Sequence, residues 1–146
     1  MNPKDRSDRF ELIAACDGDV LAGFADDVLA SDPPLRVLQE PRPQLLMQRV
    51  VEPVERRPFN LGEVVVTPAE VVLDGVRGFA MLAGKAERAA LSGAVVDAAV
   101  AGGHELSDRM TAALERAATD RERKREREWR ESRHTTVEFE TMEDGE

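Results

Sequence analysis

The sequence has few of the residues that usually build reactive sites. Its 146 residues include one cysteine, Cys16, and two histidines, His104 and His134. A single cysteine cannot form an intrachain disulfide, and it is more often a small buried side chain than a reactive thiol. The two histidines lie far apart in the sequence and, with one cysteine, make a poor set of metal ligands. We therefore expect no catalytic residue and no metal site in this chain.

Motifs that bind phosphate or activate a nucleophile are missing as well. Gly62, Gly75, Gly78 and Gly84 do not have the spacing of a Walker loop or of a dinucleotide fingerprint. No serine lies in a nucleophile elbow. An enzyme that acts alone on a phosphorylated small molecule is therefore disfavoured, and we expect this chain to bind no cofactor by itself.

Long apolar runs are missing too. None approaches the roughly 20 residues of a membrane span, and the N-terminal residues do not have the pattern of a signal peptide. We expect a cytoplasmic protein that does not enter a membrane. Aromatic residues make up 4% of the chain, with no tyrosine and one tryptophan. A core of alanine, valine and leucine buries little apolar area, so the domain is expected to need a partner surface.

The chain is acidic, with a net charge of −9, and only three of its twenty basic residues are lysine. This balance disfavours the whole chain as a nucleic-acid binder and suits a salt-rich cytoplasm. Residues 116–133 differ, because eight basic and five acidic residues give them a net charge of +3. We interpret them as a helical arm that is solvated or docks on another protein. The alternative is a stand-alone adaptor or RNA-binding protein that uses this basic helix.

Helical patterns flank a central β region. Residues 5–30 are predicted to be helical, with a break at Asp17-Gly18-Asp19, because aspartate favours a cap and glycine weakens a helix interior. A second helix is predicted over residues 85–101, where apolar residues recur at helical spacing. A third is predicted to begin near Ser107 and to continue into the charged arm.

The central region is predicted to form a small antiparallel sheet. Residues 45–51 and 61–73 are strand candidates, and Asp74-Gly75 predicts a tight hairpin into a strand over residues 76–83. Because residues 61–73 carry valine at positions of both parities, we expect that strand to be buried on both sides. Pro68 cannot donate to a ladder, so we expect a bulge or an edge position there.

The last residues change pattern again. From Thr135 onward the apolar residues alternate, which predicts a short strand or extended tail that could add a strand to a partner or to a second copy. The predicted fold is therefore α+β, with helices packed on a small antiparallel sheet and a long charged helix that ends in an extended tail. We expect a single domain of residues 1–146. Its parts are a helical segment (1–34), a sheet with a helix (35–103), and an arm with its tail (104–146).

One run of residues is specific enough to indicate a family. The sequence resembles the PhnG family in its central signature, Pro58-Phe59-Asn60-Leu61-Gly62-Glu63 followed by Val66-Thr67. The resemblance covers most of the chain from about Val37 and ends in the tail Val137-Glu138-Phe139-Glu140-Thr141-Met142. The chain departs from the family at Pro68-Ala69, where an Arg-Cys pair is usual, and at Glu140, where a second phenylalanine is usual.

The resemblance implies a role in phosphonate catabolism. It implies a non-catalytic subunit of a carbon–phosphorus lyase core complex, with PhnH-, PhnI- and PhnJ-like subunits as partners. In that complex the PhnI-like subunit is the nucleosidase centre, and an alkylphosphonate displaces adenine from ATP. The complex thus uses ATP, although this subunit is expected to bind none by itself. Self-association within the complex is a further expectation.

From the residues and the resemblance together we expect nine interface residues. We interpret the segment around residues 57–63 as a turn ordered by Asn60 and Glu63. The predicted interface residues are Phe59, Asn60, Leu61, Gly62, Glu63, Trp129, Val137, Phe139 and Met142.

Overall fold

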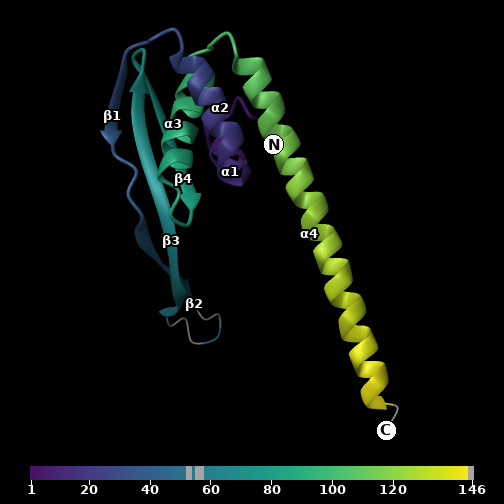
Figure 1. Cartoon of the computed structure of the whole chain (residues 1–146). Coiled ribbons are helices and arrows are strands. Elements are labelled where there is room, and N and C mark those ends of the chain that lie inside the picture. The colour runs from purple at the N-terminus through teal and green to yellow at the C-terminus, as the bar shows by residue number, and fades with distance from the viewer. Residues whose placement is uncertain (52–53, 55–57, 145–146) are drawn as a thin grey trace.

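The computed structural model describes the backbone of residues 1–51, 54 and 58–144, and the side chains of residues 1–47, 54 and 62–133. Within these residues the fold is α+β, as predicted (Figure 1). Its elements in chain order are α1 (Arg6–Ala15), α2 (Gly18–Leu29), β1 (Leu35–Gln39), β2 (Gln44–Val51), β3 (Pro58–Leu73), β4 (Val76–Ala83), α3 (Glu87–Ala101) and α4 (Ser107–Asp144).

The antiparallel sheet is organised around β3. On one side β3 pairs with β4, and on the other it pairs with β1 and β2, which follow one another along its length. Asp74 and Gly75 join β3 to β4 with positive φ angles of 47° and 80°. Both central residues of a type I′ turn need positive φ, so the predicted hairpin is confirmed.

Pro68 occupies a position in β3 that needs no backbone donor. It lies opposite Met81 of β4, in register with a two-residue hairpin closed by Leu73 and Val76. Counting from that closing pair, Pro68 is in a non-hydrogen-bonded pair, so its nitrogen points away from β4. On that other side β2 pairs only as far as Val66, and β1 pairs only as far as Glu70. Pro68 is therefore at a local edge, one of the two expected alternatives.

The helices cover one face of the sheet, so the expected burial of β3 on both faces is wrong. Ala69 and Val71 point toward the helices and are fully buried, whereas Val64 is 37% exposed. No helix packs against the other face of the sheet in the described chain (Figure 1). Valine there reflects β propensity rather than burial.

Helix α3 lies in very close contact with β4. A Cβ atom added to Gly78 would lie 2.1 Å from the carbonyl oxygen of Ala94 and 2.7 Å from the Cβ of Ala98. Glycine and alanine thus let the helix backbone approach the strand, and valine and leucine fill the remaining space. The core joins α1, α2, α3, the inner face of β3 and β4, and the start of α4.

The predicted break in the N-terminal helical region is also confirmed. Helix α1 ends at Ala15 and α2 begins at Gly18. Between them, the Oδ1 atom of Asp17 accepts a hydrogen bond from the backbone N–H of Asp19 at 2.8 Å. Aspartate at this position caps the first turn of α2.

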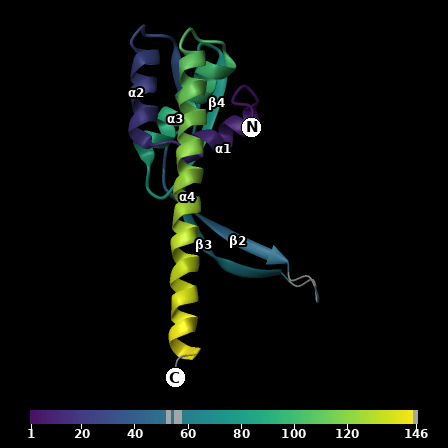
Figure 2. The same cartoon turned by 90° about the vertical axis from the view of Figure 1, so that its right-hand side faces the viewer.

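The extended tail predicted from Thr135 is wrong, because α4 continues through it to Asp144. Adding a residue to an existing helix requires no new nucleus and satisfies its backbone hydrogen bonds within the helix. A strand would need a neighbour, and in the described chain none lies beside this end of α4 (Figures 1 and 2). The alternating pattern was therefore overridden by helix propagation.

Candidate docking surfaces

A two-stranded ribbon extends beyond the helices. We define the ribbon as β2 together with residues 58–66 of β3 (Figure 2). β2 packs mainly on β3 and not on the helices. Two strands without a helix or a further strand are only marginally stable in water. The ribbon is therefore an element whose own chain gives it little support.

Apolar side chains of the ribbon are exposed on both of its faces. Leu45 and Met47 are 65% and 51% exposed, and their partners Val65 and Glu63 continue the inner face of the sheet. Leu46 and its partner Val64 lie on the outer face, and they are 42% and 37% exposed. Exposed apolar residues that cluster in this way mark interaction sites in soluble proteins.

Gly62 shapes the ribbon through a β-bulge. Gln48 pairs with Gly62 and Arg49 with Asn60, so Leu61 is the extra residue on β3. Gly62 has a φ of 145°, a conformation that side-chain-bearing residues rarely adopt. The central signature of the sequence thus lies in the bulged part of β3. The turn that we expected at this segment is wrong for residues 58–63, since an uninterrupted strand runs through them.

The free edge of β4 is covered by charged side chains. The backbone N–H of Phe79 donates to the Oδ2 atom of Asp97 at 2.9 Å, and Nη2 of Arg6 donates to the carbonyl oxygen of Arg77 at 2.5 Å. Phe79 also stacks on Phe10 of α1, with ring centroids 5.8 Å apart. A covered edge cannot accept another strand, so the sheet can be extended only at the side of β1 and β2.

Asp97 belongs to a fully buried ion pair. Its Oδ1 atom accepts a hydrogen bond from Nε of Arg9 at 2.5 Å, and both side chains are 2% exposed. Nη1 of Arg9 also donates to the carbonyl oxygens of Pro3 and Lys4. The pair ties α1, α3 and β4 together, and within the described residues no buried side-chain nitrogen or oxygen lacks a hydrogen-bond partner. It forms no open site for a substrate.

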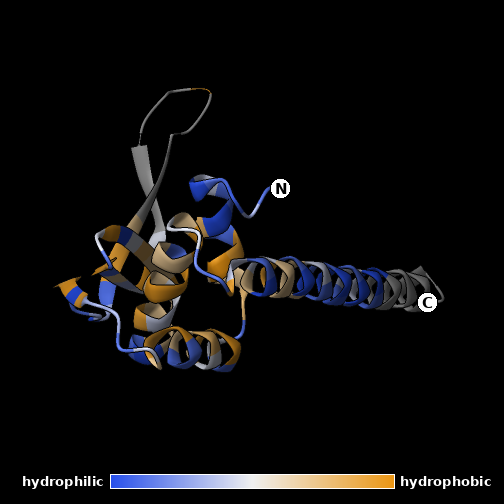
Figure 3. Ribbon diagram, turned by 90° about the horizontal axis from the view of Figure 1, so that it is seen from above, coloured by the Kyte–Doolittle hydropathy of each residue, from blue (hydrophilic) through white to orange (hydrophobic). Residues whose placement is uncertain are grey.

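The second protruding element is the far part of α4. We call residues 119–144 the arm, because the apolar stripe that holds α4 on the body ends at Ala118. Met110 and Leu114 are buried at the root of the helix, whereas every described side chain from 119 to 133 is exposed. Figure 3 shows the same change, from apolar turns at the body to hydrophilic turns beyond it.

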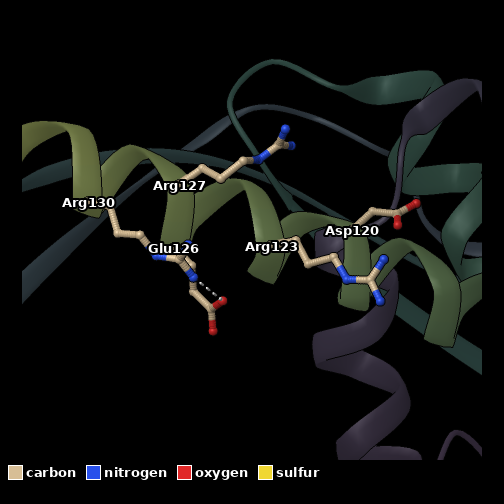
Figure 4. A pocket seen from close by; sticks show the side chains of 5 residues that line it. All are labelled: Asp120, Arg123, Glu126, Arg127 and Arg130. Atoms are coloured by element: carbon tan, nitrogen blue, oxygen red, sulfur yellow. Dashed lines mark ion pairs between the residues drawn. The ribbon is translucent and has the colours of Figure 1, made fainter.

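Arginines line one side of the arm. Arg123, Arg127 and Arg130 border a shallow hollow together with Asp120 and Glu126 (Figure 4). The one ion pair drawn there joins Nη2 of Arg130 to Oε2 of Glu126 at 3.8 Å. The single tryptophan, Trp129, is 62% exposed and has the guanidinium of Arg133 over its ring. The arm can therefore offer cationic groups and one aromatic ring to another molecule.

Cys16 and His104 are held in structural roles. Cys16 is buried, and burial, followed by the nearby Asp17 carboxylate, raises the pKa of its thiol, which a backbone hydrogen bond lowers in part. Nδ1 of His104 accepts a hydrogen bond from the backbone N–H of Leu106 at 3.0 Å. Within the described residues, no group of three histidine, cysteine or acidic side chains could hold a metal ion.

The predicted interface residues fall on both protrusions. Gly62 and Glu63 are exposed on the ribbon, and Trp129 is exposed on the arm. Phe59, Asn60 and Leu61 lie on the ribbon and Val137, Phe139 and Met142 on the arm, but their side chains are outside the described set, so their contacts stay predictions. Sequence reasoning did not single out Leu45, Leu46 and Met47 as exposed. The three residues form an apolar run in a predicted strand, but such a run is equally typical of a strand that is buried in the core.

Comparison with known proteins completes the description. A family model, described as phosphonate metabolism protein PhnG, matches residues 4–145. The chain belongs to the PhnG family. The match extends the resemblance from the central signature to α1 and α2, which the motifs did not cover. No curated protein matches the chain. In the described part of this PhnG-family chain, no helix is long and apolar enough to cross a bilayer.

Proposed function

We propose that this PhnG-family chain is a non-catalytic subunit of a carbon–phosphorus lyase core complex. In this proposal it supports the displacement of adenine from ATP by an alkylphosphonate, with PhnH-, PhnI- and PhnJ-like proteins as its partners. Catalysis resides in a partner, and this chain contributes to the assembly of the complex in the cytoplasm. ATP is bound by the complex and not by this chain alone.

The observation that carries the proposal is the exposed apolar ribbon. Leu45, Leu46 and Met47 are each at least 42% exposed on a strand that its own helices do not cover. Apolar area buried on binding contributes about 25 cal/mol per Å², so a partner that covers these residues gains stability.

Reconstitution with the partner subunits tests the role. The PhnH-, PhnI- and PhnJ-like proteins are mixed with and without this chain, and adenine released from ATP in the presence of methylphosphonate is measured. We expect adenine release to need this chain. If the rate is the same when it is omitted, the proposed function is wrong.

A pair of variants tests whether the ribbon is the docking surface. Leu45→Asp together with Met47→Asp places charges on the inner face of the ribbon, and we expect co-purification with the partners to be lost. The matched control is Val20→Asp, which alters a 42% exposed apolar residue on α2 and should co-purify normally. If the ribbon variant and the control co-purify with the partners equally well, the ribbon is not the docking surface.

The alternative is a stand-alone adaptor or RNA-binding protein that uses residues 116–133. It is favoured by the arginines beside Trp129, since RNA-binding surfaces combine basic groups with exposed aromatic rings. It predicts binding to single-stranded RNA that weakens steeply with salt and is lost when Arg121, Arg123, Arg125 and Arg127 are neutralised. Five acidic residues in the same segment weigh against it.

A further inference from the structure

The charged residues of helix α2 are all acidic. Residues 10–35 contain six acidic residues and no basic one. Asp19, Asp26 and Asp27 are exposed on α2, and the opposite side of the helix is buried in the core. We call these three residues the α2 acidic face.

Two of these carboxylates are in an unfavourable place for their own helix. Asp26 and Asp27 lie in the last turn of α2, which contains no basic residue. The C-terminal end of a helix carries partial negative charge, so acidic side chains there are destabilising. Neither carboxylate has an ion-pair partner among the described residues. Residues that are unfavourable for their own helix in this way are usually found at functional surfaces.

The complementary charge lies on α4. Arg116, Arg123, Arg127 and Arg130 are spaced by seven, four and three residues, which places them on one side of the helix. We call them the arginine stripe. Asp120 and Glu126 border the same hollow, and Glu126 is paired with Arg130 (Figure 4). The seven residues from Arg123 to Arg130 equal the seven from Asp19 to Asp26, so both charge patterns advance by about two turns.

The two surfaces cannot meet along their length within one chain. Arg116 and Asp17 line the same hollow, so α2 begins beside the near part of α4. The far end of α4 extends away from α2 (Figures 1 and 2), and the hollow that Arg123, Arg127 and Arg130 border is lined by residues of α4 alone. The far part of the stripe is therefore available only to another molecule.

We propose that the arginine stripe of one copy binds the α2 acidic face of a second copy. Two copies related by a two-fold axis make this contact twice, each arm lying along the α2 of its partner. Both surfaces are supplied by the same chain, so no further partner chemistry is needed. The proposal is independent of the proposed function, since an assembly subunit could work with or without this contact.

Salt dependence of the wild-type chain is the first test. Sedimentation velocity of the full chain is compared at about 0.1 M and about 1 M NaCl, where the Debye length falls from about 10 Å to about 3 Å. We expect a dimer at the lower salt that dissociates at the higher one, with a dissociation constant at least about tenfold larger. A monomer at both concentrations of salt, or a dimer insensitive to salt, overturns the proposal.

Charge reversal locates the contact. Asp26→Arg with Asp27→Arg, and Arg123→Glu with Arg127→Glu, should each abolish the dimer. The first pair places favourable charge at the end of α2, and the second keeps good helix formers in α4, so neither should unfold its helix. Combining the two pairs should restore the dimer.

A matched combination separates pairing from net charge. Arg121→Glu with Arg125→Glu makes the same charge change on the other side of the arm. Added to the α2 reversal, it restores the same net charge of −9 as the first combination. We expect this control to remain monomeric. If both combinations restore the dimer, or neither does, the proposed pairing of the stripe with α2 is wrong.

Discussion

Replacement of Asp97 by alanine should destabilise the fold strongly. In the native protein the Asp97 carboxylate accepts from Nε of Arg9 at 2.5 Å and from the backbone N–H of Phe79 at 2.9 Å. Without it, the buried Arg9 guanidinium keeps only the carbonyl oxygens of Pro3 and Lys4 as partners. The variant therefore leaves the buried Arg9 charge without its carboxylate and the part-buried N–H of Phe79, at the edge of β4, without its acceptor.

The expected magnitude follows from the burial of both partners. Removing one partner of a buried ion pair costs about 3–5 kcal/mol, whereas exchanging both for apolar residues is often close to neutral. Since a domain is stable by about 5–15 kcal/mol, Asp97→Ala should lose a large part of the total. Arg9→Met should cost less, because Asp97 then keeps the Phe79 N–H and has Nε of Arg6 at 3.9 Å.

Urea unfolding followed by far-UV circular dichroism measures these differences. Fluorescence is unsuitable, because the only tryptophan lies exposed on the arm. Arg9→Met combined with Asp97→Leu should be more stable than Asp97→Ala. Glu70→Ala is the matched control, since it breaks an ion pair to Arg77 whose side chain is 69% exposed and should cost less than about 1 kcal/mol.

The reasoning would be refuted by a small effect. If Asp97→Ala unfolds with the same midpoint as Glu70→Ala, the buried pair does not hold α1, α3 and β4 together. The reasoning would also be refuted if Arg9→Met lowered the free energy of unfolding clearly more than Asp97→Ala. The smaller cost expected for Arg9→Met is derived from the partners that Asp97 keeps in that variant.

Three further outcomes are expected. Gly78→Ala should destabilise the chain by about 1–3 kcal/mol in urea unfolding, because its Cβ would meet the Ala94 carbonyl, whereas Gly23→Ala, with open space around it, should be neutral or stabilising. Cys16 has a raised pKa in the folded state, so the free energy of unfolding should fall as the pH rises from the pKa of the unfolded thiol to the higher folded value. Cys16→Ala should lack this component, as pH-dependent urea titrations would show. A chain that ends after Glu126 should have the same free energy of unfolding in urea to within about 0.5 kcal/mol, because the described side chains beyond it are exposed.

Local signals in the sequence predicted much of the fold correctly. The break capped by Asp17, the Asp74-Gly75 hairpin and the helix start near Ser107 depend on the conformations of single residues, which neighbours in space change little. At Pro68 a bulge or an edge position was expected, and the pairing of β1, β2 and β4 with β3 decided for the edge. The burial of β3 was predicted wrongly, because valine favours strands whether or not a second layer covers them. The tail was predicted wrongly as a strand from its alternating apolar residues, because extending the existing helix α4 requires no new nucleus.

The candidate site was predictable only in part. The charge of residues 116–133 and the family signature at residues 58–63 are properties of the sequence, and both pointed to protruding elements. That Leu45 and Met47 are exposed could not be read from the sequence, because an apolar strand residue looks the same whether a helix covers it or not. The pairing of Arg9 with Asp97 was equally hidden, since 88 residues separate them.

The sequence by itself determined the family, the fold class, most element boundaries and the presence of an arm too polar to pack on the body. Each of these depends on residue type and on short-range spacing. Only the tertiary structure decided which faces are covered, which edge of the sheet is open, and which charges are buried as a pair. Those depend on where helices distant in sequence end against the sheet, and helix α3 stops covering it where the ribbon begins.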